Sequence, residues 1–135
     1  MAMSTKTQFI GVIDDEPDIM SLFRDALSQI KGTTVFGFTE SPLALEHFKL
    51  NQLEYCLILS DFRLAVMDGM ELLKIVKAIN HSVKTILLTG FSENEKVFEN
   101  CNCVDAFLQK PIMIPDLIDA VEIQISTRQL DGSIK

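Results

Sequence analysis

The sequence has few of the residues that build zinc sites. It holds three cysteines and two histidines among 135 residues, and no two cysteines form a Cys-x-x-Cys pair. Structural zinc needs four ligands. His47 and His81 lie far along the chain from Cys101 and Cys103, so we expect no zinc site there. Cys56 lies in an apolar run, which is typical of a small core residue.

Positive charge and long apolar segments are also scarce. Twelve basic residues stand against nineteen acidic ones, which gives a net charge of −7. A nucleic-acid surface needs a basic patch, so we expect no nucleic acid to bind. No apolar run approaches the roughly 20 residues of a membrane span. Residues 1–8 lack the apolar core of a signal peptide, so we expect a cytoplasmic protein without membrane contact.

Several catalytic signatures are missing as well. The chain has neither the Gly-x-x-x-x-Gly-Lys-Ser/Thr loop of nucleotide hydrolases nor the Gly-x-Gly-x-x-Gly fingerprint of dinucleotide binding. Neither histidine follows an apolar strand, so no Ser–His or Cys–His arrangement is indicated. Asp61 is followed by Phe62 and Arg63 rather than by a second aspartate two positions later, which disfavours a phosphatase with an aspartyl nucleophile.

Apolar residues make up 47% of the chain, which suits a single domain with one sizeable core. Continuous apolar runs alternate with segments of helical spacing, an arrangement that predicts a parallel sheet covered on both faces. The expected strands are 8–13, 33–38, 55–60, 84–89 and 104–109.

The segments between these strands have the apolar spacing of helices. One begins at Pro17 and ends at Gly32, with Leu22 on its apolar face. A second has Ser41 as its N-cap and runs to about residue 50. Three more helices are expected after Asp68-Gly69, over 92–100 and from Pro115.

In parallel sheets of this kind, ligands bind beyond the carboxyl ends of the strands. The polar residues at those ends are Asp14, Asp15, Glu16, Ser60, Asp61, Thr89, Gln109 and Lys110. Several carboxylates in one cleft need a hard cation, and Mg²⁺ takes a few carboxylates together with waters and a phosphate. A lysine and a hydroxyl suit the oxygens of a phosphoryl group, which leaves Asp61 as the phosphate acceptor.

These motifs resemble the receiver domain of two-component response regulators. The matching residues are Asp-Asp at 14–15, SDFRLAVMDG at 60–69, Thr-Gly at 89–90, Phe107, and Lys-Pro at 110–111. The resemblance implies an α/β flavodoxin-like (βα)5 three-layer sandwich with a parallel sheet of order 2-1-3-4-5. It covers residues 8–127, so residues 1–7 are expected as an N-terminal tail and 128–135 as a C-terminal tail or the start of a linker.

The resemblance also implies a role for individual residues. Asp61 is implied as the phosphoacceptor, with Lys110 and Thr89 each binding a phosphoryl oxygen. Thr89 and Phe107 are implied as the switch pair that responds to phosphorylation. The Lys110–Pro111 peptide bond is often cis in the family.

A Mg²⁺ site is implied by the same motifs. Asp15, Asp61 and the backbone carbonyl of Arg63 would ligate the metal directly, and Asp14 would hold it through water. The side chains of Arg63 and Phe91 occupy the positions that gate the hydrolytic water in the family. Neither has the amide or carboxylate that orients a water, so we expect a long-lived phosphoryl group.

The implied partners are a histidine kinase or a histidine phosphotransfer protein, with Ile19 and Met20 as candidate contacts, and an output domain or partner protein. The expected activity is self-phosphorylation and slow autodephosphorylation, with no external substrate. A receiver-like interaction module that is never phosphorylated is the alternative. The chain has Ala65 where the family usually has proline, and "ENCNCVDAF" departs from the usual end of the fourth helix, which leaves dimerisation open.

Overall fold

The computed structural model describes residues 7–90 and 102–133. Five strands form one parallel sheet in the order β2-β1-β3-β4-β5, which confirms the predicted topology. The strands are β1 (Gln8–Ile13), β2 (Thr33–Phe38), β3 (Tyr55–Asp61), β4 (Lys84–Thr89) and β5 (Ala106–Gln109). The described helices are α1 (Pro17–Leu27), α2 (Ser41–Leu50), α3 (Gly69–Ile79) and α4 (Ile114–Ser133).

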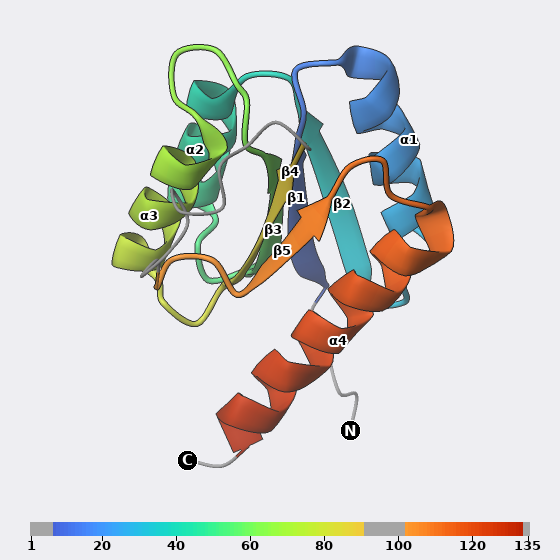
Figure 1. The fold of residues 1–135 in the computed structure, drawn as a ribbon. Helices are drawn as coiled ribbons and strands as arrows, with labels where there is room; N and C mark the ends of the chain where they lie inside the picture. The colour runs from blue at the N-terminus through green and yellow to red at the C-terminus, as the bar shows by residue number, and fades with distance from the viewer. Residues whose placement is uncertain (1–6, 91–101, 134–135) are drawn as a thin grey trace.

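The helices cover both faces of the sheet, as Figure 1 shows, with α2 and α3 on one face and α1 and α4 on the other. Each face has its own apolar core. Phe48, Leu72 and Val76 pack beneath α2 and α3. Phe23, Leu117 and Val121 pack beneath α1 and α4. Because β1, β3 and β4 are apolar on both sides, the sheet is buried between two helical layers.

The first helix is shorter than the apolar spacing predicts. It ends at Leu27, and the chain then tightens through i→i+3 hydrogen bonds from Gln29 to Ala26 and from Ile30 to Leu27. Gly32 follows with a positive φ of 77°, which a glycine adopts without strain. Leu22 is half exposed, contrary to its predicted place on the buried face.

The chain from β5 onward also differs from the prediction. β5 begins at Ala106 rather than at residue 104. Just before it, the carboxylate of Asp105 accepts the backbone N–H of Thr85 (2.8 Å). Helix α4 continues past residue 127 to Ser133, so the expected C-terminal tail is largely helical. The helix predicted over 92–100 lies outside the described residues.

The N-cap of α2 is Glu40, not Ser41. Ser41 is the first helical residue, and its hydroxyl is completely buried. The hydroxyl donates to the backbone carbonyl of Met67, 2.7 Å away in the loop between β3 and α3. The serine therefore connects two segments that are far apart in the sequence.

Candidate functional site

The carboxyl ends of β1, β3 and β5 bring one lysine between two aspartates. The Nζ atom of Lys110 lies 2.9 Å from Oδ2 of Asp14 and 3.4 Å from Oδ2 of Asp61. Asp14 is fully buried and the side chain of Asp61 is only 12% exposed. The Lys110–Pro111 peptide bond is cis, as the resemblance implies. The structure therefore unites three of the residues that the sequence placed at separate strand ends.

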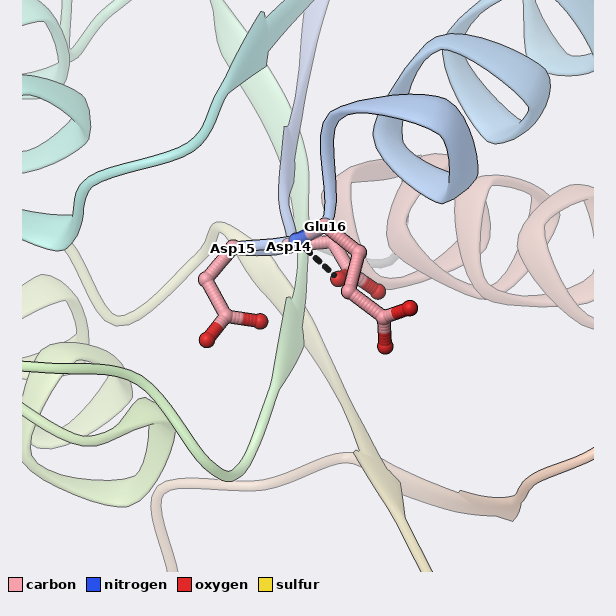
Figure 2. Close-up of side chains that lie close together, drawn as sticks. All are labelled: Asp14, Asp15 and Glu16. Atoms are coloured by element: carbon pink, nitrogen blue, oxygen red, sulfur yellow. Dashed lines mark hydrogen bonds between the residues drawn. The ribbon is translucent and has the colours of Figure 1, made fainter.

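The turn after β1 carries three adjacent carboxylates, drawn in Figure 2. One carboxylate oxygen from each of Asp14, Asp15 and Glu16 lies within 4.8 Å of the other two. Asp14 is held in place by accepting the backbone N–H of Glu16 (3.0 Å). Glu16 was absent from the predicted ligand set. Glu16 directly follows two aspartates at a strand end, and this position is the feature of the sequence that marks it as a candidate ligand.

Burial makes the negative charge on Asp61 unfavourable. It raises the pKa of this carboxyl from 3.8 to about 6. The positive charge of Lys110 lowers the pKa, whereas repulsion from Asp14 and Asp15 adds to the increase. Burial also works against the charge on Lys110, but the hydrogen bond to Asp14 and the two neighbouring carboxylates outweigh it and raise the pKa of Lys110. The site thus holds more negative charge than its one lysine compensates.

A hollow of about 400 Å³ opens next to the turn that follows β1. Asp15 lines it together with residues of the loop that follows Asp61, among them Arg63 and Asp68. The side chain of Asp68 is engaged as the N-cap of α3, where it accepts the backbone N–H of Glu71 (2.9 Å). Oxygen donors, excess negative charge and an open space beside them fit a hard divalent cation such as Mg²⁺.

Thr89 and Phe107 lie on the neighbouring strands β4 and β5. The Thr89 hydroxyl donates to the carbonyl of Leu108 on β5, at 3.5 Å. This distance is long for a hydroxyl donor, so the contact holds the side chain weakly. Phe107 is 44% exposed rather than packed in the core. In the sheet, Thr89 is opposite Gln109 and Phe107 is opposite Leu87. The switch role of Thr89 and Phe107 stays a prediction.

The candidate partner residues are in α1. Ile19 and Met20 are partly buried and pack against the core under this helix. Met20 lies over Gly37 of β2, where an added Cβ would come within 2.2 Å of its sulfur. This packing gives Met20 a structural role, and its contact with a partner stays a prediction. Phe91 lies outside the described residues, so its predicted role is untested.

Comparison with known proteins agrees with this arrangement. The sequence model described as "Response regulator receiver domain" matches residues 10–122. Sporulation initiation phosphotransferase F of Bacillus subtilis is 26% identical over 114 residues, which cover 84% of this chain and 90% of that protein. Transcriptional regulatory protein ZraR of Klebsiella oxytoca is 32% identical over 97 residues, which cover 72% of this chain but only 21% of that protein.

Solved structures show the same architecture. A response regulator receiver domain protein from Clostridium thermocellum superposes with a TM-score of 0.82 at 27% identity, over 91% of this chain and 98% of that one. A CheY-like receiver domain protein from Methanospirillum hungatei gives a TM-score of 0.82 at 24% identity, over 94% of this chain and 100% of that one. Within the described residues, no helix has the length and apolar composition to cross a membrane.

Proposed function

We propose that this chain, which belongs to the response regulator receiver domain family, accepts a phosphoryl group on Asp61 with the help of Mg²⁺. The observation that carries the proposal is the position of Lys110, whose ammonium contacts both Asp14 and Asp61 at the carboxyl edge of the sheet. A structural ion pair needs one carboxylate. Here one lysine serves two buried carboxylates with further acids beside them, which is a poor arrangement for stability alone.

The chemistry follows from the charges at the site. In the transfer, the bond between the donor's imidazole nitrogen and phosphorus breaks, and a bond forms between phosphorus and a carboxylate oxygen of Asp61. When bound, Mg²⁺ supplies positive charge beside the transferring oxygens. Asp15, Asp61 and the Arg63 carbonyl would hold it, with Asp14 acting through water and Glu16 within reach of the same group.

Lys110 and Thr89 have complementary tasks in this scheme. Lys110 is already next to Asp61, so its ammonium can bind a phosphoryl oxygen and stabilise the spread negative charge of the transition state. The Thr89 hydroxyl, weakly held on the β5 side, can turn to a second oxygen. Phe107 would then move into the vacated space, and phosphorylation would shift a pre-existing population between the two arrangements.

The proposed donor is a histidine kinase or a histidine phosphotransfer protein in the cytoplasm, contacted through Ile19 and Met20. The proposed output is a domain or partner protein whose activity depends on the phosphorylated state. ZraR carries a receiver-like segment that spans a fifth of its length, so such segments occur in longer regulators. The charge-dense site favours this function over that of an interaction module that is never phosphorylated.

Incubation with acetyl phosphate and Mg²⁺, followed by intact-mass analysis, tests the proposal. We expect one base-labile phosphoryl group on the wild type and none on Asp61→Asn. Asp25→Asn is the matched control, because the Asp25 side chain is 74% exposed on α1 and should leave labelling unchanged. Equal labelling of Asp61→Asn and the wild type would contradict the assignment, and an unlabelled wild type would favour the interaction module.

A further inference from the structure

The loop between β3 and α3 directly follows Asp61 and is closed at its base. The backbone N–H of Phe62 donates to the carbonyl of Leu88 on β4 (2.9 Å), and that of Gly69 donates to the carbonyl of Phe62 (2.9 Å). A Cβ at residue 69 would lie 2.1 Å from the carbonyl oxygen of Asp61, so only glycine allows this approach. Both ends of the loop are thereby fixed next to the phosphoacceptor.

The middle of the loop is a strained turn. Val66 has a positive φ of 72°, and the N–H of Met67 donates to the carbonyl of Ala65 across it (2.8 Å). This is a three-residue γ-turn of the rare type. A β-branched residue is disfavoured there by on the order of tenfold or more. The Val66 side chain is 90% exposed, so packing of that side chain does not hold the turn.

Ser41 contacts the loop at the residue after the strained one. Its hydroxyl donates to the Met67 carbonyl at 2.7 Å, a good hydrogen-bond distance, and the serine is completely buried. A serine at this end of a helix commonly caps it, yet Glu40 takes the cap position and the Ser41 hydroxyl is directed to the loop. A hydrogen bond of this kind favours the held form by about two- to twelvefold.

We infer that Ser41 is a positioning residue for the phosphoacceptor loop, which it holds in the γ-turn against the conformational preference of Val66. The inference rests on the proposed function, because the same loop brings Arg63 and Asp68 to the hollow that would receive the metal. A released loop would no longer hold Arg63 at the hollow that Asp15 also lines. The apparent metal affinity would then fall with the fraction of molecules that keep the loop in place.

The test follows backbone amide signals of residues 62–69 by NMR, first without metal and then during a Mg²⁺ titration of the full chain. In Ser41→Ala we expect shifted or broadened amides at 66 and 67 without metal, and a Mg²⁺ dissociation constant raised about threefold or more. Ser28→Ala is the matched control. It removes an exposed hydroxyl that donates to the backbone carbonyl of Arg24 at 2.7 Å, at the end of α1. We expect no change in the loop amides or in the Mg²⁺ dissociation constant.

A second substitution separates positioning from general destabilisation. Glycine adopts a positive φ without strain, so Val66→Gly keeps the turn without help from Ser41. In the Val66→Gly background, Ser41→Ala should raise the dissociation constant less than 1.5-fold and leave the loop amides in place. If Ser41→Ala only lowered the overall stability and left the loop in place, Val66→Gly would not rescue the Mg²⁺ affinity, because the effects of the two substitutions would then be independent.

Two results would overturn the inference. The first is that Ser41→Ala has the same loop amide signals and the same Mg²⁺ affinity as the wild type. The second is that Ser41→Ala lowers the Mg²⁺ affinity equally in the wild-type background and in the Val66→Gly background. Failure of the proposed function gives a different result. In that case the wild type itself shows no Mg²⁺-dependent shift at residues 62–69, and the metal-free spectra alone decide whether Ser41 holds the loop.

Discussion

Replacing Asp61 by asparagine should stabilise the metal-free protein at neutral pH. The substitution keeps the shape of the side chain and removes a buried negative charge. Since burial raises the pKa of Asp61 from 3.8 to about 6, the ionised carboxylate is disfavoured in the folded state by about 3 kcal/mol. Lys110 loses one of its two carboxylate partners but keeps Asp14, which offsets part of this gain. We expect a net increase of about 1 to 3 kcal/mol in the free energy of unfolding.

The pH dependence of this difference has a definite sign. The folded-state pKa lies above the unfolded value, so the folded protein binds the proton more tightly. The favourable contribution of Asp61 is complete below about pH 3.8 and is lost as the pH rises through about 6. The advantage of Asp61→Asn should therefore be small near pH 4, grow between pH 4 and 7, and level off above that.

Urea unfolding followed by circular dichroism, in EDTA at several values from pH 4 to 8, measures this difference. Asp25→Asn is the control for the loss of an exposed carboxylate on α1 and should stay close to the wild type throughout. Added Mg²⁺ should stabilise the wild type more than Asp61→Asn and so reduce the gap. A difference between Asp61→Asn and wild type that is the same at pH 4.5 and pH 8 would refute the electrostatic reasoning.

Three further predictions concern the surroundings of the site. Gly69→Ala should lower the free energy of unfolding by about 3 kcal/mol or more in urea titrations, because its Cβ would meet the Asp61 carbonyl oxygen at 2.1 Å, and an unchanged midpoint would contradict the contact. Asp105→Ala should destabilise the protein by about 2 to 4 kcal/mol and more than Lys77→Met, since it leaves both Lys77 and the Thr85 amide without their carboxylate, and the reverse order in urea would be inconsistent with this network. Arg63→Asn should shorten the lifetime of the phosphoryl group on Asp61 in a phosphate-release assay, and equal lifetimes would argue against gating by this side chain.

The alternation of strands and helices, and the gathering of polar residues at one edge of the sheet, follow from local patterns in the sequence. Continuous apolar strands alternating with amphipathic helices predict the parallel sheet. A strand that is covered on both faces needs apolar residues at successive positions, whereas a strand with one solvent-exposed face alternates apolar and polar residues. The order of the sheet came from the resemblance. The positions of Asp14, Asp61 and Lys110 at strand ends predict a common edge, because parallel strands end on the same side of a sheet. Their contacts through Lys110 agree with that expectation.

Other features depend on contacts between distant segments, which no local pattern carries. Ser41 next to Pro42 has the signature of an N-cap, yet its hydroxyl bonds to Met67, 26 residues later. The γ-turn at Val66 contradicts the local preference of valine, so no propensity argument predicts it. The elevated pKa of Asp61 likewise depends on burial, which raises it, and on Asp14 and Asp15, which come from a distant part of the chain and raise it further. The sequence by itself determined the chemistry available at the edge of the sheet. The tertiary structure alone decided how that chemistry is held, because the hydrogen bonds and charges that hold it come from residues far apart in the chain.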